Sequence, residues 1–310
     1  MSMESFARNQ EFFCSDCPRG CGALRSKAAA GGFCRSYSLP AVARAAAHFG
    51  EEPCISGVRG SGAVFFAGCS LRCVFCQNYE ISRSGEGERV SVPLLREILL
   101  RLRDTGVHNI NLVTASHFVR PVAEALSGLS LGIPVVWNSS GYESVETLRM
   151  LEGLVQVYLP DYKYADAEAA RKYSAAPDYP EAASAALQEM FRQRGSFVLD
   201  GDGMLQSGVL IRHLILPGNA ENSMNAIDFV ADTFPRGSVL FSLMSQYTPM
   251  PGLEAFPELQ RRVSAEEYEL LLHYLHTRRL ENGFWQELSS ATGELIPAFD
   301  GTGVGSAVDK

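Results

Sequence analysis

Residues 63–78 read AVFFAGCSLRCVFCQN, an apolar run that leads directly into a loop with three cysteines. The run has the length and composition of a buried strand, and Cys69, Cys73 and Cys76 follow it. Structural zinc requires four ligands, whereas three thiolates can bind three irons of a cubane iron–sulfur cluster and leave the fourth iron open. The spacing C-x3-C-x2-C therefore favours a cluster with one exchangeable position. Zinc, or reduced thiols packed in a core, are the alternatives.

This strand is the first of a series in which short apolar runs alternate with amphipathic stretches. Such alternation predicts parallel strands joined by right-handed helical crossovers. The apolar runs lie at 63–68, 110–115, 133–138, 154–160, 209–218 and 238–247, and the helical stretches at 91–105, 118–129, 143–152, 181–194 and 221–233. Six such units predict an α/β fold, namely a partial (β/α)6 TIM-like barrel with an N-terminal cysteine-rich extension.

Three further elements are predicted outside this series. Ser38 precedes an alanine-rich stretch, which predicts a helix over 38–50. Ser264 and Glu267 predict a capping box at the start of a helix over 264–279, whose apolar stripe should pack on the barrel. The tail LIPAFDGTGV, residues 295–304, is expected to lie across the surface.

The distribution of the eight cysteines divides the chain into two predicted parts. All of them lie at or before residue 76, which favours metal or redox chemistry over a disulfide framework. We predict a cysteine-rich, metal-binding extension over residues 1–55. Residues 56–310 would then form the barrel domain with its C-terminal helix and tail.

A second cysteine cluster lies inside the predicted extension, with the spacing C-x2-C-x3-C-x12-C. It consists of Cys14, Cys17, Cys21 and Cys34. Four thiols at this spacing suit a closed tetrahedral zinc site, and an auxiliary iron–sulfur cluster is the alternative. The nearby cations Arg19, Arg25 and Lys27 would offset the charge of four thiolates. Cys54 stands alone and is interpreted as a packing residue.

Composition and charge exclude several classes of protein. The chain has 310 residues, 46% of them hydrophobic, and this is enough for a large core. Its formal net charge of −8 and the lack of a basic block argue against non-specific nucleic-acid binding. The N-terminus does not resemble a signal peptide, and no apolar stretch is long enough for a membrane span. We therefore expect a soluble, cytoplasmic protein.

Unusual polar residues occupy the carboxyl ends of the predicted strands, where ligands bind in such folds. They are Thr114, Ser116, His117, Asn138, Ser139, Asp161, Lys163 and Arg212. Arg212 lies inside an apolar strand, and an unpaired charge there would be costly, so a role in holding a carboxylate is favoured. For the others, ordinary structural roles stay open: His117 at a helix start, the NSSG stretch as a turn, and Asp161 with Lys163 as a surface ion pair.

The three-cysteine loop, with an aromatic residue before its last cysteine, resembles the signature of radical S-adenosylmethionine (SAM) enzymes. Within that superfamily, the sequence is similar to the pyruvate formate-lyase activating enzyme-related group from about residue 13 to residue 304. The similarity is carried by SGVRGSGAVFFAGCSLRCVFCQNYEIS, SSGYESVETLRMLEG, VYLPDYKY, LIRHLILPG and the leading CSDCPRGCGALR. The resemblance implies that S-adenosylmethionine chelates the open iron of a 4Fe–4S cluster held by the three cysteines. Reductive cleavage would form a 5′-deoxyadenosyl radical that abstracts hydrogen from a substrate.

The resemblance also implies roles for individual residues. Phe75 occupies the position of the aromatic ring near the adenine, and Asn78 follows it in the same cofactor-binding loop. Asp161 and Lys163 resemble the Asp-x-Lys of glycyl-radical activating enzymes and, with Arg212, are the catalytic candidates. Asn138 and Ser139 are expected to contact the methionyl carboxylate or ribose of S-adenosylmethionine.

One motif of the better-known activating enzymes is missing from this sequence. They carry a Gly-Gly-Glu-like stretch after the second strand, whereas this chain has VTASHF. Thr114, Ser116, His117 or nearby backbone carbonyls would therefore hold the amino group of S-adenosylmethionine.

The expected function is that of a radical SAM enzyme, and the specific version of this hypothesis is that it activates a glycyl radical enzyme. Its partners would be that protein or peptide substrate and an electron donor such as flavodoxin or ferredoxin. Radical modification of a small molecule or another peptide is one alternative. A non-catalytic zinc or iron–sulfur interaction module is the other, although a scaffold has no need for polar residues at the strand ends.

Overall fold

The computed structural model describes residues 11–286, 288 and 296–305. Its centre is a mostly parallel sheet with the strand order β12-β11-β10-β8-β7-β6-β4-β3-β5. Seven strands of the described chain run parallel and in chain order: β4 (Ser61–Phe66), β6 (Ile110–Val113), β7 (Val135–Ser139), β8 (Val157–Pro160), β10 (Leu205–Leu214), β11 (Leu240–Met244) and β12 (Gly283–Trp285). The predicted α/β partial barrel is confirmed. The sequence pattern gave only six strands because β12 is too short to show a periodicity.

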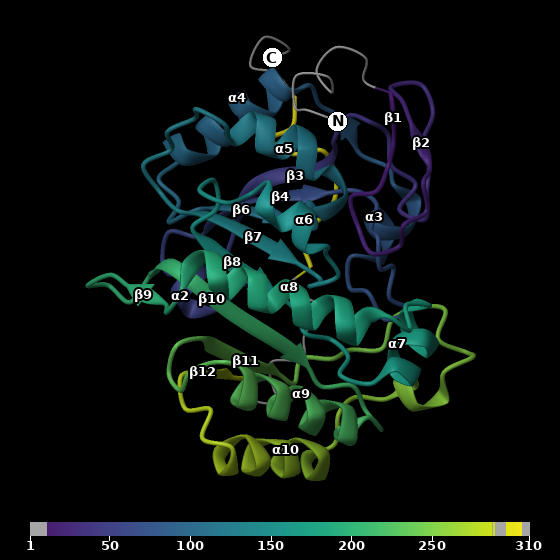
Figure 1. The fold of residues 1–310 in the computed structure, drawn as a ribbon, viewed down its shortest axis with the longest axis vertical. Helices are drawn as coiled ribbons and strands as arrows, with labels where there is room; N and C mark the ends of the chain where they lie inside the picture. Colours follow the sequence, from purple (N-terminus) through teal and green to yellow (C-terminus); the bar gives the residue numbers. More distant parts are fainter. Residues whose placement is uncertain (1–10, 287, 289–295, 306–310) are drawn as a thin grey trace.

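Helices connect the parallel strands and lie at the places that the sequence predicts. The matched helices are α4 (Val92–Asp104), α5 (Val119–Leu126), α6 (Val145–Arg149), α8 (Tyr179–Arg194) and α9 (Ala220–Thr233). Several short elements are not predicted by the sequence pattern. The helical ones are α2 (Pro53–Ser56), α3 (Tyr79–Ser84), α7 (Ala167–Ser174) and the 3-10 turns η1 (Ser116–Phe118) and η2 (Pro257–Gln260). The strands are β1 (Phe12–Phe13), β2 (Leu24–Arg25), β5 (Glu88–Arg89) and β9 (Val198–Leu199). In Figure 1 the strand arrows point toward the side where α3 and α7 lie.

The helix predicted over 38–50 is wrong, because this segment forms strand β3 (Ala41–His48). β3 pairs antiparallel with β4, from Val42 opposite Phe66 to His48 opposite Ser61. Its alanines favour a helix intrinsically, but pairing with a neighbouring strand and burial of one face override that preference. Since β3 belongs to the main sheet, the domain boundary predicted at residue 55 lies beyond a strand of the barrel.

The C-terminal tail crosses β3. The Ala45 N–H donates to the Thr302 carbonyl at 2.8 Å, and the Gly301 N–H donates to the Ala43 carbonyl at 3.0 Å. A Cβ at Gly303 would stand 1.9 Å from the Ala45 carbonyl oxygen, so only glycine allows this approach. The tail was expected to lie across the surface, but it also buries Val304 completely. Leu295, its first predicted residue, lies outside the described residues.

The last helix, α10 (Ala265–Thr277), begins with the predicted capping box. The Glu267 N–H donates to the Ser264 hydroxyl at 3.2 Å, and the Ser264 N–H donates to the Glu267 carboxylate at 2.9 Å. α10 packs against α9 rather than directly on the strands, as the lower part of Figure 1 shows. The buried Leu271 and Leu275 join it to the main hydrophobic core.

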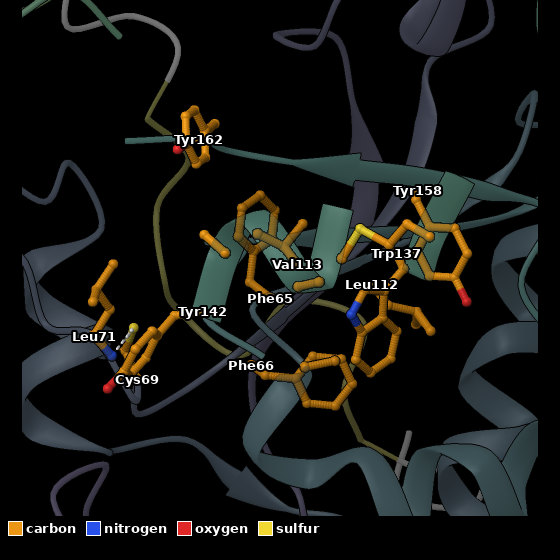
Figure 2. Packing of buried hydrophobic residues seen from close by; sticks show 14 of the residues in the cluster. Phe65, Phe66, Cys69, Leu71, Leu112, Val113, Trp137, Tyr142, Tyr158 and Tyr162 are labelled. Carbon is orange, nitrogen blue, oxygen red and sulfur yellow. Dashed lines mark hydrogen bonds between the residues drawn. The ribbon is translucent and has the colours of Figure 1, made fainter. Parts of the chain in front are cut away.

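The core is formed by side chains from neighbouring strands and the helices that cover them. Leu112 on β6, Trp137 on β7 and Tyr158 on β8 are neighbours across the sheet, and all are fully buried (Figure 2). This rigid layer fixes the carboxyl ends of the strands in space. In the described part of the chain, no helix is long and apolar enough to cross a membrane.

The cysteine-rich segment forms a small unit of its own beside the sheet. β1 and β2 pair antiparallel, with Phe12 opposite Arg25 and Phe13 opposite Leu24. In Figure 1 this two-stranded unit lies on the same side of the molecule as α3. The unit therefore lies near the loop that follows β4.

Candidate functional site

A pocket of about 1130 Å³, including its open mouth, lies at the carboxyl ends of the parallel strands. Polar residues from β7, β8 and β10 and their following loops line it together with the three-cysteine loop. Of the residues singled out by the sequence, it contains Cys69, Cys73, Phe75, Cys76, Asn78, Thr114, Asn138, Ser139, Asp161, Lys163 and Arg212. Residues more than 140 positions apart in the chain therefore meet in one place.

The three-cysteine loop turns sharply so that its thiols face the pocket. Gly68 and Arg72 take the left-handed conformation, with φ values of 82° and 52°. The backbone N–H groups of Leu71 and Arg72 point at the Cys69 sulfur, at 3.3 and 3.5 Å, and Figure 2 marks the first of these contacts. Backbone donors directed at a sulfur stabilise its thiolate form.

Burial makes the thiols of Cys69 and Cys76 poor acids when no cation is bound. Burial first, and then the neighbouring thiols of Cys76 and Cys73, raise the pKa of Cys69 to about 12. Burial and the Cys73 thiol also raise the pKa of Cys76. Three mutually repelling sulfurs at the wall of one pocket are suited to a positively charged metal centre, which would ionise them.

A largely buried charge network also lines the pocket and is centred on Arg212. Its Nη1 lies 2.7 Å from Glu51 Oε2, its Nε lies 2.8 Å from Asp161 Oδ1, and its Nη2 donates to the Asn138 side-chain oxygen at 2.6 Å. Burial alone would lower the pKa of Arg212, but the charges of Asp161, Glu51 and Glu52 raise it well above its usual value. Arg212 is therefore a permanent cation.

Lys163 and Asp161 form the second pair of this network. Lys163 Nζ lies 2.5 Å from Asp161 Oδ2. Burial would raise the pKa of Asp161, but the charges of Arg212 and Lys163 lower it below its usual value. Burial would lower the pKa of Lys163, but Asp161 and then the Cys73 thiol raise it. Both groups are therefore charged, and the Lys163 cation lies close enough to Cys73 to interact with it.

Sequence reasoning missed the acidic partner of Arg212, Glu51, which lies in the loop after β3. Its carboxylate accepts hydrogen bonds from the Asn138 side chain at 2.9 Å and from the Asn111 side chain at 3.1 Å. The neighbouring Glu52 is buried as well, and burial raises the pKa of its carboxyl. The pair of glutamates before Pro53 was the available signal, but nothing in their spacing links them to β10.

Thr114 follows β6 and lines the pocket in a strained conformation. Its φ of 62° is unfavourable for a β-branched residue. The hydrogen bond from its N–H to the Asn138 carbonyl, 2.8 Å long, holds this conformation. Strained residues of this kind concentrate at functional sites.

Ser116 and His117 lie outside the pocket, and both have structural partners. The Ser116 hydroxyl donates to Glu143 Oε1 at 2.7 Å. The His117 ring nitrogen Nε2 lies 2.9 Å from the Ala67 carbonyl oxygen, and burial lowers the pKa of His117 to about 3. We therefore do not include these two residues among the proposed cofactor ligands.

Ser139 and Glu143 show how the end of β7 is fixed. The buried Glu143 accepts hydrogen bonds from Ser139 at 2.7 Å and from the Trp137 indole at 2.6 Å. Ser139 lines the pocket, but its hydroxyl is already engaged in this way. Asn138, next to it, directs its side chain to Glu51 and Arg212, so the NSSG stretch is more than a turn.

Phe75 and Asn78 belong to the cysteine loop and its continuation. The Phe75 ring packs edge-to-face against Tyr164, Tyr173 and Tyr247, with ring centroids 6.2 to 6.3 Å apart. Asn78 is the residue before α3, and its side chain makes no capping hydrogen bond. Its amide therefore remains available to a ligand in the pocket.

The four N-terminal cysteines lie together on the other side of the cysteine loop. Cys14, Cys17 and Cys34 are buried, and Cys21 is exposed. Burial raises the pKa of Cys14 to about 12 and that of Cys17 to about 11. Among the described residues, no three His, Cys, Asp or Glu side chains already stand as ligands around a single metal ion.

Comparison with known proteins assigns the chain to a family. Residues 63–230, more than half of the chain, match the radical SAM superfamily, and the chain belongs to this superfamily. An uncharacterized protein of Methanocaldococcus jannaschii is 29% identical over 264 residues, which cover 81% of this chain and 71% of that protein.

The solved structures of two proteins are also similar to this chain. Streptococcus suis SuiB has a TM-score of 0.49 and 15% identity over 75% of this chain, and methylornithine synthase has a TM-score of 0.47 and 16% identity over 76% of this chain. The match spans 52% of the SuiB chain and 67% of the methylornithine synthase chain. A second SuiB structure, bound to S-adenosylmethionine, has a TM-score of 0.45.

Membership of this superfamily implies a 4Fe–4S cluster and S-adenosylmethionine, and the residues of the pocket fit these groups. Three thiols from one loop would provide three cluster ligands, and Cys69, Cys73 and Cys76 are the cysteines among the described residues that line the pocket. S-adenosylmethionine carries an amino group and a carboxylate at its methionine end. The pocket offers charges opposite to both, namely the carboxylates of Glu51 and Asp161 and the cations of Lys163 and Arg212. The family match shows the radical SAM superfamily, and it does not distinguish the glycyl-radical activating enzymes from other members.

Proposed function

We propose that this protein is a radical SAM enzyme in which Cys69, Cys73 and Cys76 hold the 4Fe–4S cluster and S-adenosylmethionine binds beside it. The observation that carries this proposal is that the three thiols line the same pocket as the buried charge network around Arg212. When bound, the reduced cluster and S-adenosylmethionine supply a 5′-deoxyadenosyl radical for abstraction of a hydrogen atom.

Within the pocket, Lys163 is the group best suited to bind the carboxylate of S-adenosylmethionine. Its ammonium has three donors, and Asp161 takes one of them. Arg212, by contrast, already donates through each of its three nitrogens to Asp161, Glu51 and Asn138. We therefore assign Arg212 the role of a positioning residue, which orients Asp161 and Asn138 toward the cofactor.

The remaining contacts to S-adenosylmethionine would come from the strand ends and the cysteine loop. The strained backbone at Thr114 and the side chains of Asn138 and Ser139 lie where its polar groups would be held. Phe75 and Asn78 line the cysteine side, where the adenine and ribose would lie.

Apolar side chains complete the pocket and would shield a radical from water. They are Phe65, Leu71, Val113, Leu214 and Met244. Exclusion of water would strengthen the charged interactions inside the pocket and limit side reactions of a reactive intermediate.

The substrate that we propose is a protein or peptide, with a glycyl radical enzyme as the specific case. The support is the motif similarity to the activating-enzyme-related group and the open mouth of the pocket. Modification of a small molecule is the alternative. A one-electron carrier such as flavodoxin or ferredoxin would reduce the cluster, and this chemistry suits the reducing cytoplasm.

Binding of S-adenosylmethionine to the anaerobically reconstituted protein tests the assignment of the pocket. We expect Lys163→Met to raise the Kd at least about tenfold, because a charge-assisted hydrogen bond contributes roughly 1.5–3 kcal/mol. Lys172→Met is the matched control, since Lys172 pairs with Glu258 on the surface. Equal binding isotherms for the two variants would contradict the role of Lys163. Absence of binding by the unaltered, cluster-loaded protein would favour a non-catalytic iron–sulfur module.

A further inference from the structure

Among the residues that the structure describes, the buried Arg25 of β2 has no carboxylate partner. It is only 2% exposed, and its Nη2 donates to the Cys34 sulfur at 3.0 Å. Its Nη1 donates to the His117 carbonyl, and its Nε has no hydrogen-bond partner in the described part of the chain. Asp16, the nearest acid in the sequence, pairs with Arg120 instead. A guanidinium cation removed from water needs a compensating negative charge, and a neutral thiol does not provide it.

The four N-terminal cysteines gather where that negative charge is needed. A Cβ at Gly32 would stand 3.1 Å from the Cys21 sulfur and 3.7 Å from the Cys34 sulfur, so both sulfurs face the Gly32 backbone. Gly32 has a φ of 76°, and the missing side chain leaves space between them. Electrostatic interactions connect Cys17 with both of these thiols, and Cys14 with Cys17.

We infer that Cys14, Cys17, Cys21 and Cys34 bind a metal centre as four thiolates and that its net negative charge is the counter-charge of Arg25. A zinc ion and an iron–sulfur cluster both satisfy the donor set and carry net negative charge with four thiolates. Because no three of these groups yet stand as ligands around one ion, the thiols must draw together when the metal binds. This inference does not depend on the reaction proposed above.

The position of this metal centre indicates that it stabilises the loop that holds the first cluster. Arg19 lies between Cys17 and Cys21 and donates to the Ser70 carbonyl at 2.9 Å and to the Ser174 carbonyl at 2.6 Å. The guanidinium groups of Arg19 and Arg72 lie 4.0 and 5.1 Å from the ring centroid of Phe33, the residue before Cys34. The metal-bound unit would thus hold the back of residues 68–76 in place.

Metal analysis of a full-length chain without the first cluster tests the centre directly. In a protein with Cys69→Ala, Cys73→Ala and Cys76→Ala, purified without oxygen from cells supplied with iron and zinc, we expect about one zinc or about four irons per chain. Zinc identifies a structural ion, and iron identifies a second cluster. Addition of Cys14→Ser and Cys17→Ser should remove this metal, whereas addition of Cys54→Ala, another buried cysteine, should not. Equal metal content with and without Cys14 and Cys17 would overturn the inference.

Alkylation of the unaltered protein provides a second test that does not require a variant to fold. Cys21 is exposed, so its free thiol should react rapidly with iodoacetamide. A bound thiolate is protected, and we expect Cys14, Cys17, Cys21 and Cys34 to become reactive together when a chelator removes the metal. Mass spectrometry of the peptides reports each site. Rapid alkylation of Cys21 before chelation, at the rate found after chelation, would contradict the centre. Failure of S-adenosylmethionine binding would leave both results unchanged.

Discussion

At the scale of single residues, Arg212 is the side chain on which the pocket depends. Its partners Glu51 and Asp161 come from different parts of the chain, and their side chains are only 8% and 15% exposed. Removal of the cation would leave Glu51 without its cationic partner and Asp161 paired with Lys163 alone, in a region of low dielectric constant. The same change would release Asn138, whose side-chain oxygen is held by Arg212 Nη2.

We therefore predict that Arg212→Met lowers the free energy of unfolding by about 3 kcal/mol. Arg192→Met is the control, because Arg192 pairs with Glu189 and Glu152 while half of its side chain is exposed. Because solvent screens these pairs, Arg192→Met should change the free energy of unfolding much less than Arg212→Met. Urea denaturation of the metal-free proteins measures both values. A loss for Arg212→Met no larger than that for Arg192→Met would refute the buried-network interpretation.

His213 makes stability depend on pH. Its ring nitrogens lie 2.6 Å from the Tyr162 carbonyl oxygen and 2.9 Å from the Ser223 hydroxyl, and burial lowers the pKa of His213 to about 4. In the unfolded chain, the ring takes up a proton near its ordinary pKa of about 6.5. The unfolded state therefore binds more protons between these two values, and stability falls as the pH falls through this range.

For His213→Gln we expect a smaller loss of stability between pH 7.5 and pH 5.5 than in the unaltered protein. The difference should be about 1 kcal/mol, because in this pH range the His213 ring takes up a proton in the unfolded state but not in the folded state, and glutamine does neither. The buried His117, whose pKa is lowered in the same direction, contributes equally to both proteins. Urea midpoints at the two pH values measure the effect. Parallel pH profiles for the two proteins would show that His213 is protonated in the folded state as well.

At the scale of elements, the contact between the N-terminal unit and the β4 loop depends on Gly68. Its φ is 82°, and an added Cβ would stand 2.6 Å from the Cys34 carbonyl oxygen. Gly106 has a φ of 85°, but a Cβ there would meet nothing within 4 Å. The two glycines thus share a backbone conformation and differ in their surroundings.

The two alanine variants separate these effects. Gly106→Ala should lower the free energy of unfolding by about 1 kcal/mol, which is the cost of a left-handed backbone with a side chain. Gly68→Ala should cost at least about 1 kcal/mol more, because the Cys34 backbone must move away. Thermal unfolding of both variants measures the difference. Equal shifts in Tm would mean that the two units are not packed together at this point.

The elements also show which features a sequence pattern can predict. Long apolar runs and their intervening helices were located correctly, and the capping box of α10 was recognised from Ser264 and Glu267. The strand β3 was mistaken for a helix, because alanine has a high helix propensity and its partners β4 and the C-terminal tail are distant in the sequence. Tertiary contacts with small side chains leave no periodic signal.

At the scale of the whole molecule, the sheet brings distant residues into one pocket. The cysteines and the strand-end residues Asp161, Lys163 and Arg212 could be predicted because parallel strands end on the same side. Glu51 could not, because its position depends on the path of a loop after a strand that was not recognised. Ser116 and His117 follow a strand end as well, but their side chains turn to Glu143 and Ala67. The direction in which a side chain points is set by tertiary packing, whereas its position at a strand end can be predicted from the sequence.

The central claim is that the three thiols of the β4 loop build a centre that cleaves S-adenosylmethionine reductively. The most direct measurement is the formation of 5′-deoxyadenosine by the anaerobically reconstituted, dithionite-reduced protein. We predict 5′-deoxyadenosine from the unaltered chain and none above background from Cys73→Ala, whose fold is checked by circular dichroism. Full cleavage by Cys73→Ala, or no cleavage by unaltered protein that contains about four irons per chain at the first cluster, would contradict the account.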